Sequence, residues 1–159
     1  MSEYSVDADV GKISQHLGTE VVAAGAVQLK RTLLESVIQF LILSVFGALL
    51  KTILSNFVKQ KQSYLVLSSK ALHEVTFVGG SLSNRRDFPL DAIRAPEATS
   101  DETSLRVAFD CSGTRETFKL FQYQWFDMDG AYSTDTAEMK RVGELTSRME
   151  RTLKALPAG

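Results

Sequence analysis

An apolar stretch over residues 33–58, LLESVIQFLILSVFGALLKTILSNFV, constrains this chain more than any other feature. A run of large apolar side chains of this length is too costly to leave in water. It must enter a lipid bilayer, a partner protein or the core of the chain itself. Its destination decides what kind of protein the sequence encodes.

A membrane crossing by this stretch is at the limit of its length. Residues 36–50 carry no charge, but as a helix they extend only about 22 Å, against roughly 30 Å of hydrocarbon. A crossing helix therefore needs Glu35 or Lys51 to reach an interface. The second half of the stretch also separates into an apolar and a polar face, which a single lipid-facing span does not require. The sequence is compatible with a single membrane span, a helix lying in the membrane interface, and a helix packed between subunits.

The residues that we predict to contact the membrane or a partner are large apolar side chains and nearby lysines. The lysines would face anionic headgroups if the helix lies flat, and would favour a cytoplasmic location for the following residues if it spans. The predicted contact residues are Phe40, Phe46, Leu50, Lys51, Phe57, Lys59 and Lys61.

Length, charge and cysteine content bound the rest of the chain. Its 159 residues are enough for one domain with an appendage. A net charge of −1 gives no support for nucleic-acid binding, which needs a clustered basic surface. Cys111 is the single cysteine, so no internal disulfide forms and a reducing cytoplasmic setting is favoured. Residues 1–18 are mildly acidic and lack the basic start and apolar run of a secretory signal, so export is not expected.

We predict three parts along the chain. Residues 1–32 form a polar N-terminal segment, residues 33–62 a hydrophobic helix with its linker, and residues 63–159 a β-domain with a C-terminal helix. Within the first part, residues 10–17 favour a short helix, and residues 20–29, EVVAAGAVQL, are compatible with either a strand or a lead-in to the apolar helix.

Alternation of apolar and polar residues predicts the strands of the β-domain. The predicted strands cover residues 63–69, 70–78, 104–111 and 115–121, with residues 84–87 as turn or edge material. Two glycines end the second strand, and Ser-Gly-Thr makes a tight turn before the fourth. Because the connections are too short for crossover helices, the strands form an antiparallel meander.

A final helix follows an aromatic-rich segment. Asp135 and Glu138 stand at the N-cap and N3 positions, and Pro157 ends the helix. Its apolar residues recur at helical spacing and would cover the open end of the curled sheet. They are Met139, Val142, Leu145, Met149, Leu153 and Leu156. The predicted fold class is α+β, an antiparallel barrel or sandwich capped by this helix and preceded by the long hydrophobic helix.

These runs resemble the bacterial pleckstrin-homology-like (PH-like) domain. The resemblance lies in LVLSSKALHEVTFVGG, RRDFPLDAI and LRVAFDCSGTRETFKLF, followed by the amphipathic helix, and LGTEVVAAGAVQLKR is similar to the lead-in of membrane-attached members. The resemblance implies a strongly bent antiparallel barrel capped at one end by the C-terminal helix. It also implies a non-catalytic platform for lipid, peptide or protein partners, in a group that accompanies membrane helices or self-assembles.

A candidate ligand or partner surface combines basic and aromatic residues. Phosphoinositide-binding members of the family carry basic residues around the first hairpin, and the nearest matches here depart from that spacing. The aromatic group after residue 121, which includes Tyr132, either packs over the barrel or supplies an interaction surface. The candidate residues are Lys70, Arg85, Arg86, Tyr123, Trp125 and Phe126.

Catalytic and metal-binding motifs are not apparent. FDMDG resembles part of a calcium loop, but with Gly130 at loop position six, Trp125 and Thr136 stand where acidic ligands are needed. His73 and Cys111 favour core packing over a base and nucleophile pair. We therefore expect no catalytic activity, no cofactor, no metal site and no small-molecule substrate.

The sequence thus predicts a non-catalytic, membrane-associated PH-like binding or scaffolding protein whose module faces the cytoplasm. Its expected partners are membrane lipid or a membrane-protein assembly, and not nucleic acid. The alternative is a soluble, cytoplasmic homo-oligomer of PH-like domains assembled through residues 33–58.

Overall fold

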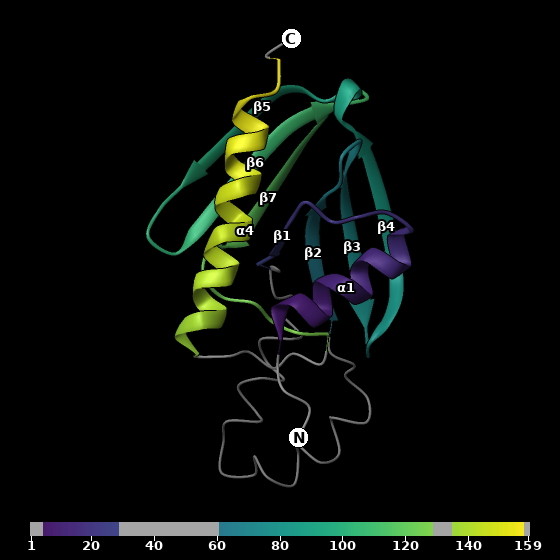
Figure 1. Ribbon diagram of the computed structural model, residues 1–159. Helices are drawn as coiled ribbons and strands as arrows, with labels where there is room; N and C mark the ends of the chain where they lie inside the picture. The colour runs from purple at the N-terminus through teal and green to yellow at the C-terminus, as the bar shows by residue number, and fades with distance from the viewer. Residues whose placement is uncertain (1–4, 29–60, 129–134, 158–159) are drawn as a thin grey trace, which may run out of the picture.

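Two antiparallel sheets and two α-helices make up the described part of the chain in a computed structural model, which describes residues 5–28, 61–128 and 135–157 (Figure 1). The expected α+β class is confirmed. In chain order the elements are α1 (Val6–Leu17), β1 (Ala23–Ala26), β2 (Lys61–Leu67), β3 (Ala71–Val78), β4 (Ser81–Pro89), the 3-10 helix η1 (Leu90–Ala92), β5 (Arg94–Ser100), β6 (Ser104–Cys111), β7 (Thr114–Phe121) and α4 (Thr136–Lys154).

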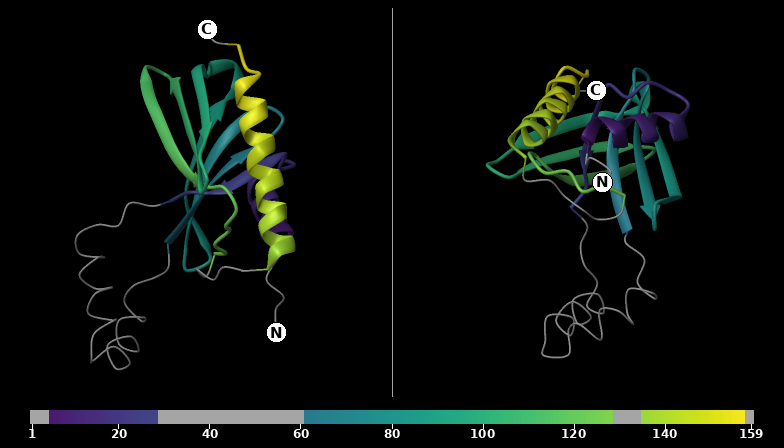
Figure 2. Two further views of the ribbon diagram at one scale, coloured as in Figure 1. Left: turned by 90° about the vertical axis from the view of Figure 1, so that its left-hand side faces the viewer. Right: turned by 60° about the horizontal axis from the view of Figure 1, so that its bottom comes forward.

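The seven described strands follow one another around an open barrel. One sheet has the order β1-β2-β3-β4 and the other β5-β6-β7. A bridge between Val27 and Leu120 joins the first sheet to the second, and the Gln28 amide donates a 2.7 Å hydrogen bond to the Lys119 carbonyl. The continuous order is therefore β4-β3-β2-β1-β7-β6-β5, with β4 and β5 as the outer edges (Figures 1 and 2).

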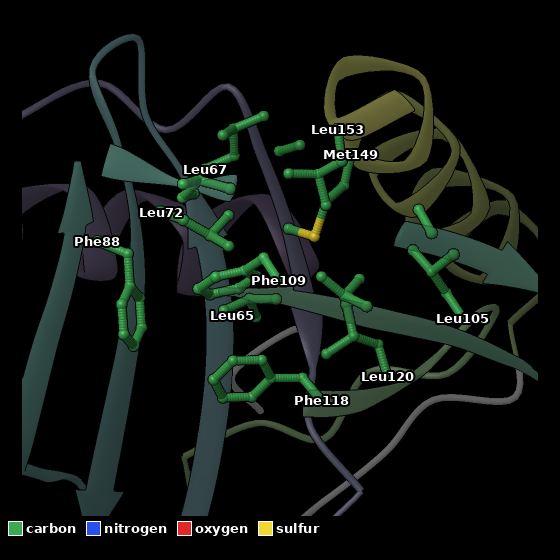
Figure 3. Close-up of a cluster of buried hydrophobic side chains, with 14 residues drawn as sticks. Leu65, Leu67, Leu72, Phe88, Leu105, Phe109, Phe118, Leu120, Met149 and Leu153 are labelled. Carbon is green, nitrogen blue, oxygen red and sulfur yellow. The ribbon is translucent and has the colours of Figure 1, made fainter. Parts of the chain in front are cut away.

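The larger core lies between the two sheets and is closed on one side by α4 (Figure 3). Phe88, Phe109 and Phe118 form its aromatic centre, with the rings of Phe88 and Phe109 edge to face at 5.1 Å. Helix α4 contributes Met149 and Leu153, both about 1% exposed or less. The strand alternation of the sequence supplies this face, as expected for a sheet that is buried on one side.

A second core lies on the outer face of the four-stranded sheet, beneath α1. The rings of Tyr64 and Trp125 stack at 4.7 Å within it. The Trp125 indole donates a 2.9 Å hydrogen bond to the carboxylate of Asp9 on α1. The Val6 amide at the start of α1 donates to the Glu138 carboxylate of α4. Residues near the N-terminus are thus an integral part of the fold.

The domain boundaries differ from those predicted. Residues 1–32 were expected to form a separate segment, but α1 covers a core and β1 pairs with β2. Strand β2 also begins at Lys61, inside the predicted linker. The sequence of β1, AAGA, shows no alternation because all four of its residues are buried.

All four predicted strands are confirmed, and one edge strand was not predicted. The strands predicted over residues 63–69, 70–78, 104–111 and 115–121 correspond to β2, β3, β6 and β7. Residues 84–87 belong to the edge strand β4. Strand β5 was not predicted because its sequence, RAPEATS, contains a proline, which is uncommon inside strands. Its pairing with β6 also has a register shift between Arg94 and Glu97.

The C-terminal helix follows its predicted pattern closely. The Asp135 carboxylate accepts hydrogen bonds from the amides of Ala137 and Glu138, so it caps the helix as expected. Val142, Leu145, Met149 and Leu153 are buried. The Glu138 carboxylate also contacts α1, because it accepts the hydrogen bond from the Val6 amide.

The predicted hydrophobic helix over residues 33–58 lies outside the described residues. So do Phe40, Phe46, Leu50, Lys51, Phe57 and Lys59 of the predicted contact set. Within residues 5–28, 61–128 and 135–157, no helix combines the length and the apolar composition needed to cross a bilayer.

Gly25 tests how closely β1 approaches the second sheet. A Cβ at this position would lie 2.9 Å from Leu120 Cδ1 and 3.4 Å from Thr146 Cγ2. We expect Gly25→Ala to lower the free energy of unfolding by roughly 1–3 kcal/mol, the usual cost of overpacking a core. Urea denaturation measures the change.

Gly11→Ala is the matched control. Nothing lies within 4 Å of a Cβ at Gly11 in the exposed face of α1. This variant should be more stable by roughly 0.5–1 kcal/mol, because alanine favours a helix. Equal stabilisation by both variants would contradict the close approach of β1 to β7.

Candidate functional site

The base of the β1–β2 hairpin is the place where residues 29–60 leave the described domain and return to it. The two strands are antiparallel, with Ala26 opposite Tyr64. The Val27 amide donates a 2.9 Å hydrogen bond to the Ser63 carbonyl, and the Gln62 amide group donates to the Val27 carbonyl at 3.4 Å. The two flanks of the apolar stretch are therefore held side by side at one end of the sheet (Figure 2).

A hollow of about 260 Å³ lies beside this base, and its lining is mainly polar. Lys61, the described member of the predicted contact set, lines it at the first position of β2 and is exposed. Ser63 and Thr76 face each other across β2 and β3, with their hydroxyl oxygens 2.7 Å apart. Both hydroxyls are thus engaged with each other at the floor of the hollow.

Arg86 connects the two sheets next to the hollow. Its guanidinium donates to Glu74 on β3 at 2.9 Å and to Glu116 on β7 at 3.1 Å, and it lies 5.2 Å from the centre of the Phe88 ring. The hydrogen bond to Glu74, followed by that to Glu116, raises the pKa of Arg86 against the effect of burial. Two carboxylates already neutralise this cation, so it contributes little positive charge to an anion site.

The three predicted basic residues do not form one cluster. Arg85 is adjacent to Arg86 in β4 and therefore points to the opposite face, where it donates to Asp87 at 2.9 Å. Lys70 is exposed in the turn between β2 and β3. The structure thus places these cations on separate surfaces, two of them paired with carboxylates.

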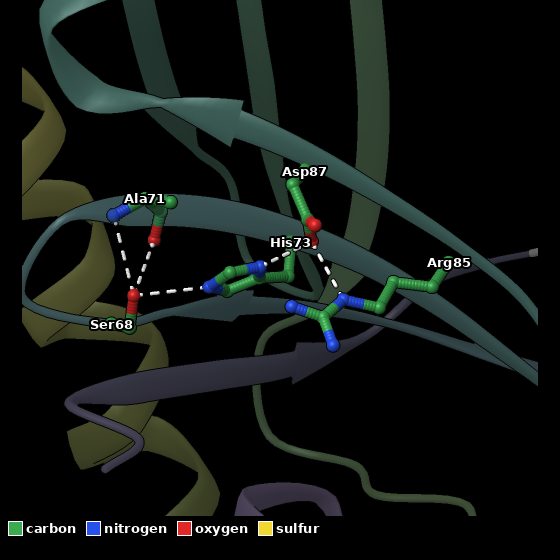
Figure 4. Close-up of polar contacts among 5 residues, drawn as sticks. All are labelled: Ser68, Ala71, His73, Arg85 and Asp87. Carbon is green, nitrogen blue, oxygen red and sulfur yellow. Dashed lines mark hydrogen bonds and ion pairs between the residues drawn. The ribbon is translucent and has the colours of Figure 1, made fainter. Parts of the chain in front are cut away.

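A serine in the turn after β2, a histidine on β3 and an aspartate on β4 form a linear network (Figure 4). The Ser68 hydroxyl lies 3.0 Å from His73 Nε2, and His73 Nδ1 lies 2.6 Å from an oxygen of Asp87. This order of groups is the one that serine hydrolases use for nucleophile, base and orienting acid. The chemistry therefore depends on whether the serine is accessible.

Ser68 serves the turn between β2 and β3. The residue is 4% exposed. Its hydroxyl lies 3.1 Å from the Ala71 carbonyl and accepts the Ala71 amide at 3.2 Å, as in a local turn that a serine closes. The network accordingly fixes the register of β2, β3 and β4. Sequence analysis did not find it, because only the pairing of His73 with Asp87 brings its members together.

His73 and Cys111 are far apart in the topology. His73 lies on β3 of the first sheet and is 4% exposed, whereas Cys111 ends β6 of the second sheet and packs partly against the larger core. Among the described residues, no group of three or more histidine, cysteine or acidic side chains is arranged to hold a metal ion.

The aromatic group separates into core and surface. Trp125, a predicted surface candidate, is 1% exposed and belongs to the core beneath α1, where Asp9 satisfies its indole nitrogen. Phe126 packs against Phe121 with the ring centres 4.9 Å apart. Tyr123 is 43% exposed and is the only exposed large hydrophobic side chain among the described residues. Tyr132 lies outside them.

Asp87 gives the network a testable pH dependence. The hydrogen bond from Arg85, assisted by that from His73, lowers the pKa of Asp87 below its ordinary value. The ionised carboxylate therefore contributes stability that is present above about pH 4 and is lost as the pH falls through the lowered pKa. Asp87→Asn should reduce the free energy of unfolding at pH 7 by roughly 0.5 kcal/mol, a small amount because solvent screens a half-exposed pair.

The gap between Asp87→Asn and the unmodified chain should close below pH 4 in urea denaturation at a series of pH values. Glu102→Gln, an exposed change in the turn between β5 and β6, is the control and should shift stability little at any pH. If the difference in the free energy of unfolding were the same at pH 3 and pH 7, the charge on Asp87 would not contribute to the stability of the network.

Comparison with known protein families, with curated proteins and with solved structures finds no match to this chain. Its function is therefore inferred from its own residues and their arrangement.

Proposed function

We propose that this chain is a non-catalytic binding or scaffolding module of PH-like architecture, attached to a membrane by residues 33–58 with its folded part on the cytoplasmic side. The observation that carries the proposal is the position of the apolar stretch. It lies in the sequence between β1 and β2, two paired strands of a domain whose described residues form two apolar cores.

The order of elements supports the PH-like assignment. The seven described strands form two antiparallel sheets, the segment just after β1 bridges to β7, and the C-terminal helix packs against the core between the sheets. This is the bent, helix-capped arrangement that the sequence resemblance implies. Helix α1 is an addition to it, and it covers the outer face of the four-stranded sheet (Figure 1).

The described domain offers little apolar surface to the inserted stretch. The large apolar side chains of residues 5–28, 61–128 and 135–157 pack into two cores, and among these residues only Tyr123 exposes a large hydrophobic side chain. A stretch as apolar as residues 33–58 needs a larger partner than this. A bilayer provides one, and so does the same stretch of another copy.

The hairpin also limits how the stretch enters a membrane. A single crossing would separate its two flanks by the roughly 30 Å of the hydrocarbon layer, whereas paired strands lie about 4.8 Å apart. Val27 and Ser63 are hydrogen-bonded, so both flanks belong on the same side. Attachment from one side is consistent with the short uncharged run and with Lys61 beside the base of the hairpin.

Excision of residues 29–60 separates attachment from folding. We expect a chain in which Asn-Gly joins residue 28 to residue 61 to fold with unfolding cooperativity like that of the full chain. Five residues then connect the hydrogen-bonded Val27 and Ser63, and hairpin loops of four or five residues are common. It should stay in the supernatant when vesicles are pelleted, while the full chain sediments with them. Deletion of residues 1–62 should instead prevent folding, since it removes α1, β1 and the start of β2.

Vesicle sedimentation together with light scattering distinguishes membrane attachment from assembly of several copies through residues 33–58. A full chain that stays in the supernatant as a multimer, while the excised chain is a monomer, would favour assembly through residues 33–58 over membrane attachment. A full chain that stays in the supernatant as a monomer would contradict both.

Single-cysteine labelling tests attachment from one side. In a Cys111→Ser background, Glu20→Cys precedes the stretch and Ser81→Cys follows it, and both positions are exposed. With the full chain bound to preformed vesicles, both cysteines should react with a membrane-impermeant maleimide added outside. Protection of one flank and reaction of the other would require a single crossing, and would contradict the paired hairpin.

A further inference from the structure

We propose that Tyr123 and the outer face of α4 form a docking surface for an acidic segment of a partner protein. The proposal names a partner for the module and rests on the binding role proposed above, but it does not depend on membrane attachment. The surface consists of Tyr123, Lys140, Gly143, Ser147, Arg148 and Arg151, which line a hollow of about 380 Å³.

The Tyr123 ring packs against the backbone of α4 at Gly143. Gly143 is buried in the middle of α4, and a Cβ there would lie 3.0 Å from both Cδ1 and Cε1 of the Tyr123 ring. Glycine inside a helix costs about 1 kcal/mol relative to alanine, so its presence calls for a packing reason. Here it lets the ring rest against the helix and stay partly exposed, which fixes an aromatic contact in advance.

Unpaired positive charge surrounds this ring. The side chains of Lys140 and Arg151 have no ion pair or hydrogen bond with another described residue, and the Arg148 guanidinium donates only to the Val22 carbonyl, at 3.0 Å. Glu144 is the single acidic residue in the lining, and Arg141 lies 3.4 Å from it. Three cations against one carboxylate leave the lining with a formal charge of +2.

Four other arginines among the described residues are engaged by carboxylates. Arg85, Arg86, Arg115 and Arg141 each contact a carboxylate within 3.2 Å. The outer face of α4 therefore combines the exposed aromatic ring with cations that remain available. Arginine and tyrosine are the residues enriched in the energetic centres of protein interfaces, and arginine binds carboxylates in a bidentate manner.

The position of Arg148 and Arg151 favours a protein over a bilayer. Arg148 contacts Val22, whose amide binds Leu67 at the end of β2. Lys61 and the insertion lie at the other end of this strand, about 20 Å away at 3.3 Å per residue. A headgroup layer at the base of the hairpin would therefore lie far from Arg148 and from Arg151, one turn further along α4. Tyr123 lies nearer to the base, three residues after Leu120, which bridges to Val27. The chemistry instead fits aspartate and glutamate residues on either side of an apolar side chain.

Fluorescence anisotropy tests this surface with labelled eight-residue peptides in which Asp and Glu flank a central Phe, Leu or Tyr. The full chain, held in neutral detergent, should bind at least one peptide, with an affinity that falls as salt is added. Tyr123→Ser, Arg151→Glu and Gly143→Ala should each weaken binding by roughly tenfold. Lys12→Glu, a charge reversal on the exposed face of α1, should leave it unchanged.

Vesicle sedimentation of the same variants separates this proposal from the attachment proposal. The variants on α4 should sediment with anionic vesicles as the unmodified chain does. Failure of every peptide to bind, equal loss in Lys12→Glu, or loss of vesicle binding in the α4 variants would overturn the docking surface. Failure of the full chain to bind vesicles, with peptide binding intact, would overturn membrane attachment alone.

Discussion

The pairing of β1 with β2 is the constraint on which the rest of this structure depends. Four small residues hold together the two flanks of an apolar insertion and also join the two sheets through the neighbouring bridge to β7. Closing a long loop costs little more than closing a short one, since the entropy grows only with the logarithm of its length. A stable hairpin therefore tolerates a large insertion provided that its ladder is intact.

Helix α1 covers one face of the domain, whereas the edge strands β4 and β5 remain unpaired among the described residues. The contact of Asp9 with Trp125 satisfies a buried indole and ties α1 to the segment before α4. At the open side of the barrel, β4 carries charged residues and β5 contains Pro96 and a register shift. These are features that discourage pairing of exposed edges with other chains.

Sequence alone predicts the elements whose pattern is local. Alternation identified β2, β3, β6 and β7, and the Asp135 cap with helical spacing identified α4. The sequence did not decide whether β1 is a strand, because a strand that is buried on both faces shows no apolar–polar alternation. Strand β5 was not predicted at all. The surface around Tyr123 was anticipated only as part of an aromatic group. The role of Gly143 is visible only in the fold, which places the Tyr123 ring against it. Trp125 is recognised as a core residue only once its hydrogen bond to Asp9 is known.

Where the insertion joins the barrel also determines how mechanical load enters the domain. If the tip of the hairpin is anchored and the domain is drawn away, both arms are pulled along the same direction. The force then acts parallel to β2 and shears it against β3, a ladder of seven paired residues. Hydrogen bonds perpendicular to the strands share such a load simultaneously instead of opening one after another. A tether at this position would therefore load the sheet along its strands, the direction in which the ladder resists best.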